Sequence, residues 1–117
     1  MSAVARRRFC QALDLVDCEE RIAEYQRLHQ QIWPEVAAHL RGHGIVEMEI
    51  YRLGTRLFMV MEVDDTFNGE RFSEQSQANP DIQRWEALMW QYQAPTPWTP
   101  PGEKWVAMER IFSLQEQ

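Results

Sequence analysis

Three side chains that can do chemistry recur every four residues in the first third of the sequence. They are Tyr25, His29 and Trp33. A spacing of four residues places side chains on one face of a helix. Histidine titrates near neutral pH, and a hydroxyl or carboxylate beside it completes a pair that can donate and accept protons. The spacing therefore predicts a helical face suited to proton transfer, with His29 and Tyr25 as the first candidates.

Two carboxylates are further candidates for proton transfer. Glu86 follows Trp85 on a second helical pattern, so both could face His29 across a sheet, and Glu35 is the weaker candidate. Tryptophan can stack on the apolar face of a sugar ring while polar groups bond its hydroxyls. The alternative is structural, because a single histidine in an apolar stripe and each single tryptophan are more often packing residues.

A metal site is a second alternative for the histidines. His39 and His43 are four residues apart and could share a helical face, but no acidic or cysteine ligand nearby has a matching spacing. Cys10 and Cys18 form neither a disulfide framework nor a zinc site, and we expect reduced, partly buried thiols. The spacing of these residues therefore does not favour a metal site.

The helix that carries the histidine face has marked ends. Asp17 with Glu20 has the form of a capping box, and the run from Gly42 to Gly44 is a stop signal. Pro34 lacks the amide hydrogen that a helix interior requires. We therefore expect two helical pieces, roughly 18–32 and 34–42, with a bend at Trp33.

The other predicted elements alternate around this helix. Strands are expected over residues 8–15, 45–51, 57–63 and 104–112, with a tight turn at Gly54 and Thr55 and with Val46, Met48 and Ile50 on one side of the second strand. Residues 64–79 read as a loop with a short helix, and a second long helix begins at Pro80 and ends before Pro95. A proline-rich connection over 94–102 precedes the last strand. The order β-α-β-β-α-β predicts an α+β, ferredoxin-like fold.

Length and charge narrow the class of protein. With 117 residues, 44% of them hydrophobic, we expect one domain over 1–117 with a core of about 6–113. Eighteen acidic and twelve basic residues give a net charge of −6, which disfavours nucleic acid as a partner. No apolar run approaches the ~20 residues that cross a bilayer, and there is no signal-peptide pattern. We expect a cytoplasmic protein without a membrane partner.

The predicted layout leaves one sheet face uncovered. Both long helices lie on the same side, and the other face carries Glu47, Glu49 and Tyr51 among apolar residues. A second copy of the chain could cover this face, with Lys104 or Arg110 pairing the carboxylates. The proline-rich connection would let the last strand reach across to that copy. We therefore expect a homodimer.

Several motifs together resemble one known family, the L-rhamnose mutarotases. The resemblance rests on the run from Tyr25 to Glu35 (Tyr-Gln-Arg-Leu-His-Gln-Gln-Ile-Trp-Pro-Glu), then His43-Gly44, Ile50-Tyr51 and Gln83-Arg84-Trp85. It implies a ferredoxin-like dimeric α/β barrel that interconverts the α and β anomers of 6-deoxy sugars without a cofactor. It also implies that His29 protonates the ring oxygen while an unidentified base acts at the anomeric hydroxyl, and that Tyr25 and Trp85 contact the sugar.

Two departures from the family pattern concern the choice of sugar. Rhamnose-specific members have a sugar-binding tyrosine where this chain has Met48, and paired tryptophans where it has Trp85-Glu86. The expected monosaccharide site consists of Tyr25, Trp33, Met48, Trp85 and Glu86. A carboxylate at position 86 could read the axial hydroxyl at C4 of L-fucose, which favours L-fucose over L-rhamnose. The open alternatives are a non-catalytic sugar-binding module and a dimeric α/β barrel with a heme or oxygenase role.

Overall fold

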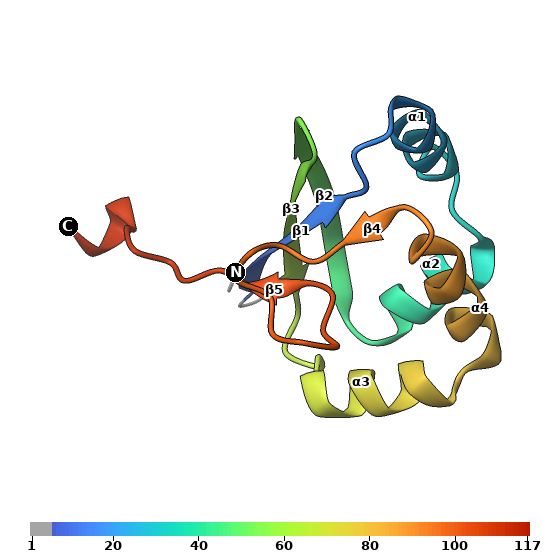
Figure 1. Cartoon of the computed structure of the whole chain (residues 1–117). Coiled ribbons are helices and arrows are strands. Elements are labelled where there is room, and N and C mark those ends of the chain that lie inside the picture. Colours follow the sequence, from blue (N-terminus) through green and yellow to red (C-terminus); the bar gives the residue numbers. More distant parts are fainter. Residues whose placement is uncertain (1–5) are drawn as a thin grey trace.

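The fold is built on an antiparallel sheet with five strands. A computed structural model describes residues 6–117; the first five residues of the expected 1–117 domain lie outside this range. The strands are β1 (Arg7–Leu15), β2 (Ile45–Leu53), β3 (Arg56–Val63), β4 (Gln93–Ala94) and β5 (Val106–Ala107). Their order is β2-β3-β1-β4 (Figure 1). The short strand β5 pairs with the same edge of β1 as β4 does, at Gln11 and Ala12 instead of Asp14 and Leu15. This order confirms the predicted ferredoxin-like α+β class.

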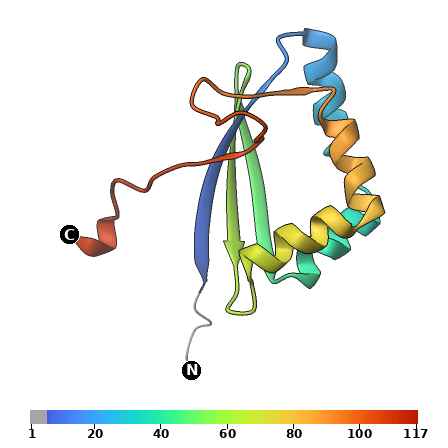
Figure 2. The same cartoon turned by 60° about the horizontal axis from the view of Figure 1, so that its bottom comes forward.

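Four helices lie on the same side of the sheet (Figure 2). They are α1 (Glu19–Leu28), α2 (Pro34–Gly42), α3 (Gly69–Ala78) and α4 (Pro80–Met89). A short 3-10 helix, Leu114–Glu116, ends the chain well away from the sheet. Within residues 6–117 no helix lies against the opposite sheet face, as the sequence predicted.

Alternation along the strands explains where the core forms. In β3 every second side chain is buried, namely Leu57, Met59, Met61 and Val63. Successive side chains of a strand point to opposite faces, so this set faces the helices. There it meets buried residues of α4, with Ile82, Trp85 and Met89 on its inner face.

The first helix is shorter than predicted. It begins after Cys18, which has no side-chain capping bond, so the expected capping box of Asp17 and Glu20 is wrong. It ends at Leu28 rather than at residue 32, because the next amides turn back to carbonyls three residues away, as Gln30 does to Arg27. Trp33 is extended, as residues before proline usually are. A link of residues 29–33 therefore replaces the predicted bend, while α2 is confirmed.

A β-bulge changes the sheet face to which the side chain of one β2 residue points. Ile45 pairs with Val63 and Glu47 with Glu62, so one residue of β2 has no partner between them. The bulge buries Ile45 and leaves Val46 exposed. The prediction that Val46 shares a face with Met48 and Ile50 is therefore wrong for Val46.

The predicted last strand, 104–112, is also wrong in extent. Only Val106–Ala107 pair with β1, and a strand that was not predicted, Gln93–Ala94, pairs further along the same edge. Prolines cannot donate to a ladder, so the proline-rich segment between them leaves the sheet and splits this edge into two short pieces. The amide of Met108 makes the last bond to β1, at the carbonyl of Cys10.

Candidate functional site

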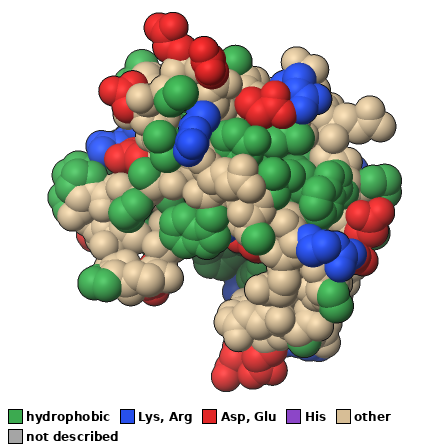
Figure 3. All heavy atoms as spheres, turned by 45° about the vertical axis from the view of Figure 1, so that its right-hand side comes forward, with side chains coloured by type: hydrophobic (Ala, Val, Ile, Leu, Met, Phe, Trp, Pro, Cys, Tyr) green, Lys and Arg blue, Asp and Glu red, His purple; other side chains and the backbone are tan. Residues whose placement is uncertain are grey.

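A cavity of about 600 Å³ lies between the sheet and the helices. Its volume is within the range typical of small-molecule sites. The space-filling view shows a hollow with hydrophobic side chains on its walls (Figure 3). Residues from β1 to β4 and from all four α-helices line the cavity.

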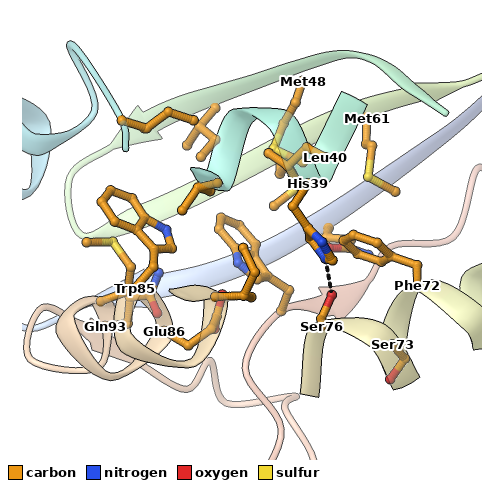
Figure 4. Close-up of a pocket in the computed structure, with 18 of the residues that line it drawn as sticks. His39, Leu40, Met48, Met61, Phe72, Ser73, Ser76, Trp85, Glu86 and Gln93 are labelled. Atoms are coloured by element: carbon orange, nitrogen blue, oxygen red, sulfur yellow. Dashed lines mark hydrogen bonds between the residues drawn. The ribbon is translucent and has the colours of Figure 1, made fainter. Parts of the chain in front are cut away.

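One end of the cavity brings together most of the predicted proton-transfer residues. The rings of Tyr25 and His29 are 4.2 Å apart, and His29 meets Trp85 edge-on with 5.6 Å between ring centres. Glu86 lines the same end beside Trp85 (Figure 4). The structure thus brings these four side chains around one space, from α1, from the residue that follows it and from α4.

The ring of His29 is held by its own helix. Its Nδ1 lies 2.8 Å from the carbonyl oxygen of Tyr25, which only accepts, so Nδ1 carries the hydrogen. The second nitrogen, Nε2, is left for other partners. Burial lowers the pKa of His29, against the smaller opposing effect of this hydrogen bond. At neutral pH the ring is therefore neutral, and Nε2 is an acceptor.

The pKa of the Tyr25 phenol is shifted in the opposite direction to that of His29. Burial raises the pKa of Tyr25, the hydrogen bond from Gln93 lowers it, and the charge of Glu86 raises it further. The Nε2 group of Gln93 donates to the phenol oxygen at 3.4 Å. Tyr25 is therefore protonated at neutral pH, and its own hydrogen remains available as a donor. A neutral imidazole and a neutral phenol thus lie side by side.

Glu86 is held by a lysine from the segment before β5. Nζ of Lys104 lies 2.6 Å from Oε2 of Glu86 and 3.1 Å from its carbonyl oxygen. The ammonium also lies 4.6 Å from the ring centre of Trp90, and its side chain is only 14% exposed. Lys104, expected to pair with Glu47 and Glu49, is therefore committed to Glu86. The other expected cation, Arg110, bonds Glu116.

Three predicted residues lie elsewhere around this site. Trp33 is not among the residues lining the cavity; it packs edge-on against Trp85, with ring centres 5.1 Å apart. Met48 lines the cavity from β2, further from Trp85 (Figure 4). Glu35 is exposed in the first turn of α2 and does not line the cavity.

The other end of the cavity lies between α2 and α3. His39 bonds the hydroxyl of Ser76 through Nε2 at 2.8 Å, and its ring packs against His43 and Phe72. Among residues 6–117 no group of three or more histidine, cysteine, aspartate or glutamate side chains could hold a metal ion. His39 and His43 thus serve packing and a hydrogen bond here. Both cysteines are free and half-buried, as expected.

Sequence reasoning missed two polar residues at the end of the cavity that holds Tyr25 and His29. Gln93 lies just after the predicted apolar face of α4, and a polar residue following such a stripe was the available signal. Lys104 is the only lysine in the sequence, which could have marked it as a residue with a specific task. The contributions of α3, Phe72 and Ser76, were missed because the sequence indicated a short helix within residues 64–79 but not where it packs.

The chain matches known proteins over most of its length. The sequence model of the L-rhamnose mutarotase family matches residues 8–114. An L-fucose mutarotase from Xanthomonas campestris is 44% identical over 115 residues, which cover 97% of this chain and 92% of that protein. An L-rhamnose mutarotase from Yersinia pestis is 35% identical over 97 residues, covering 80% and 86%.

The chain belongs to the L-rhamnose mutarotase family. The family resemblance seen in the sequence is thereby confirmed, as is the class of enzyme, a sugar mutarotase and hence an isomerase.

Two solved structures are similar in fold to this mutarotase family member. An L-rhamnose mutarotase from Formosa agariphila superposes with a TM-score of 0.66 at 19% identity, covering 92% of this chain and 98% of that one. Tetracenomycin F2 cyclase from Streptomyces glaucescens gives 0.56 at 15% identity, covering 92% and 97%. At these identities the likeness concerns the fold alone, and one fold hosts unrelated activities.

In the described part of the chain, no helix has the length and apolar character to cross a membrane.

Proposed function

We propose that this mutarotase interconverts the α and β anomers of a 6-deoxy-L-hexose and prefers L-fucose to L-rhamnose. The observation that carries the proposal is the meeting of Tyr25, His29, Trp85 and Glu86 at one end of a cavity. The 44% identity to an L-fucose mutarotase supports the choice of sugar. Trp85 offers an aromatic surface for the apolar face of the sugar ring.

The proposed reaction uses two proton transfers. Nε2 of neutral His29 takes the proton of the anomeric hydroxyl while the phenol of Tyr25 protonates the ring oxygen, and the C1–O5 bond breaks to leave the open-chain aldehyde. After rotation about C1–C2, the O5 hydroxyl attacks the other face of the aldehyde. Its proton returns to Tyr25, and His29 gives its proton to the former carbonyl oxygen.

The pKa directions support this division of roles. The resemblance by itself makes His29 the donor to the ring oxygen, which requires a charged imidazole at the start. Burial lowers the pKa of His29 and raises that of Tyr25, so the resting pair has an acceptor on the imidazole and a donor on the phenol. His29 then serves as a proton donor in ring closure.

Glu86 supports the preference for L-fucose. A carboxylate accepts from a hydroxyl in a charge-assisted bond worth roughly 1.5–3 kcal/mol. L-Fucose has its axial hydroxyl at C4, whereas L-rhamnose has it at C2. Met48 lines the cavity with apolar bulk and offers no hydroxyl. We assign Glu86 to the C4 hydroxyl of L-fucose.

The experiment compares anomer exchange of both sugars by saturation-difference NMR of the anomeric protons. Wild-type protein should speed exchange of L-fucose more than of L-rhamnose, and a folded His29→Ala protein should not exceed the spontaneous rate. Glu86→Gln should shrink the preference for L-fucose. A folded His29→Ala protein that still speeds exchange contradicts the mechanism. Binding of L-fucose by the wild type without faster exchange identifies a non-catalytic sugar-binding module.

We further propose that the protein is a homodimer. Residues 108–117 leave the body of the molecule (Figure 1), and their apolar side chains are bare: Ile111 is 90% exposed, Phe112 64% and Leu114 76%. The sheet face without helices carries Phe58 and Val60, with Tyr51 exposed beside them. Exposed apolar groups on a tail and on an open sheet face are typical of an interface between copies.

A further inference from the structure

A buried side chain at the catalytic end of the cavity has one polar atom without a partner. Gln93 is 6% exposed and lines the cavity beside Trp85 and Glu86 (Figure 4). Its amide nitrogen donates to the phenol oxygen of Tyr25, whereas no donor among the described residues reaches its Oε1. Buried polar atoms nearly always have hydrogen-bond partners, because leaving one unsatisfied costs its full desolvation. This exception therefore calls for a donor that is not part of the chain.

The position of Gln93 is fixed by the sheet. It forms β4 together with Ala94, and it lies opposite Leu15 of β1 in the ladder. The amide of Val16 bonds the carbonyl of the preceding residue, Tyr92, at 2.9 Å. A side chain mounted on a paired strand holds its acceptor more firmly than one on a loop. Gln93 therefore holds its oxygen at a fixed place in the wall of this end of the cavity, where the surrounding side chains must move for a ligand to reach it.

Resting on the function proposed above, we propose that Oε1 of Gln93 accepts a hydrogen bond from a non-anomeric ring hydroxyl of the sugar and is a specificity-determining residue. A sugar offers hydroxyl donors on C2, C3 and C4, next to the ring that Trp85 stacks on. The anomeric hydroxyl changes place when C1 turns between the two ring closures. A fixed acceptor there would favour one anomer, whereas a hydroxyl on the other carbons stays in place throughout the cycle.

The same contact also positions Tyr25. Because the amide nitrogen of Gln93 donates to the phenol oxygen, the phenol hydrogen points to another acceptor. Gln93 thus links the recognition of a sugar hydroxyl with the orientation of the proposed acid. The two roles differ in their consequences: loss of a hydroxyl contact weakens binding, while misdirection of Tyr25 slows the proton transfer.

The test replaces Gln93 by methionine, which keeps the length of the side chain and removes both polar groups. Affinity for L-fucose is measured by saturation-transfer NMR, the exchange rate by the anomeric protons, and the melting temperature by circular dichroism. Gln91→Met is the matched control, because Gln91 is an exposed glutamine two residues earlier. Gln93→Met removes the unsatisfied acceptor but also the 3.4 Å bond to Tyr25, so its melting temperature should stay close to that of the wild type.

Affinity of Gln93→Met for L-fucose should fall about threefold to tenfold, as expected for one neutral hydrogen bond, and Gln91→Met should match the wild type. Among the 2-, 3- and 4-deoxy forms of L-fucose, one should bind both proteins equally, because it lacks the hydroxyl that Gln93 accepts. Unchanged affinity overturns the proposal. A lower melting temperature with an equal loss for all three deoxy sugars overturns it too, and makes Gln93 a structural partner of Tyr25.

These readouts separate this proposal from the proposed reaction. Affinity tests the contact with Gln93 whether or not the sugar is turned over. A wild-type protein that binds L-fucose but does not speed exchange contradicts the mutarotase reaction. The affinities of wild type and Gln93→Met for L-fucose then still test the contact with Gln93. A wild-type protein that speeds exchange, with a Gln93→Met variant of equal affinity, contradicts the role of Gln93 alone.

Discussion

In the proposed reaction the two nitrogens of His29 have separate tasks, and the rate should therefore depend on pH in one direction. The proposed first step needs a neutral ring, and burial lowers the pKa of His29 below its ordinary value of 6.5. Enzymatic exchange, corrected for the spontaneous rate, should be flat above pH 6.5 and should fall only as the pH drops through the lowered pKa. A decline as the pH rises through this same range would instead make His29 the initial donor.

The same pKa shift predicts how stability depends on pH. Unfolded His29 takes up a proton near pH 6.5, whereas the folded ring takes it up only at lower pH, so the unfolded state gains protons first as the pH falls. The free energy of unfolding should therefore decrease as the pH falls from 6.5 to the lowered pKa of the folded state. Urea titrations of wild type and His29→Asn measure this; the variant should lose part of the decrease, and the part due to His39, whose pKa burial also lowers, should remain.

Lys104 gives a third prediction at the scale of single residues. Lys104→Met keeps the packed stem but removes the bond to Glu86, so the carboxylate can turn away from its place in the cavity. KM for L-fucose should rise several-fold, while the free energy of unfolding changes by about 1 kcal/mol or less, since Glu86 is 44% exposed and such pairs contribute little. Arg27→Met, which cuts an exposed pair with Glu24 on α1, is the control and should leave KM unchanged.

Single residues of the site could be predicted where the spacing was regular. Tyr25 on α1 and His29, the residue directly after its end, are four residues apart, and Trp85 follows the apolar period of α4, so pattern alone indicated that they face inward. Gln93 and Lys104 could not be found in this way. Their roles depend on where β4 and the segment before β5 meet the cavity, and these positions follow from pairing with β1, more than seventy residues away in sequence.

At the scale of elements, the junction between α2 and β2 depends on one glycine. Gly44 has a φ of 87°, and a Cβ added there would lie 2.4 Å from Oδ1 of Asp64 and 2.5 Å from Oγ1 of Thr66. Gly44→Ala should lower the free energy of unfolding by about 2 kcal/mol or more, from the left-handed backbone and the clash. Gly42→Ala, with nothing within 4 Å, should be neutral or slightly stabilising. Urea denaturation compares the two; equal losses would contradict this assignment.

Elements with clear end signals were predicted well, and those set by distant pairing were not. The second strand of the hairpin and α2 have glycine and proline at their boundaries and match closely. The end of α1 was missed because His29 and its neighbours close the helix with local hydrogen bonds that no residue type announces. The bulge in β2 was missed because a period-2 pattern cannot show where one residue lacks a partner.

At the scale of the whole molecule, the exposed tail predicts how the proposed dimer is held. Deleting residues 110–117 removes the bare side chains of Ile111, Phe112 and Leu114, so the dimer should weaken and the scattering mass should move from about twice 13.9 kDa towards 13.9 kDa. Deleting only residues 115–117 is the control and should leave the mass unchanged. A full-length protein that is a single 13.9 kDa species at micromolar concentration contradicts the dimer.

The pairing of β1 also bears on how the chain folds while it is being made. This strand is made before the others, yet among the described residues its outer edge is covered by Gln93–Ala94 and Val106–Ala107, which follow much later in the sequence. While those residues are still inside the ribosome, the hairpin of β2 and β3 can form, but β1 has one unpaired edge. Glu86 then has no lysine, and Tyr25 has no amide from Gln93. A chain that stops before Gln93 should therefore lack both contacts and expose a strand edge that invites aggregation.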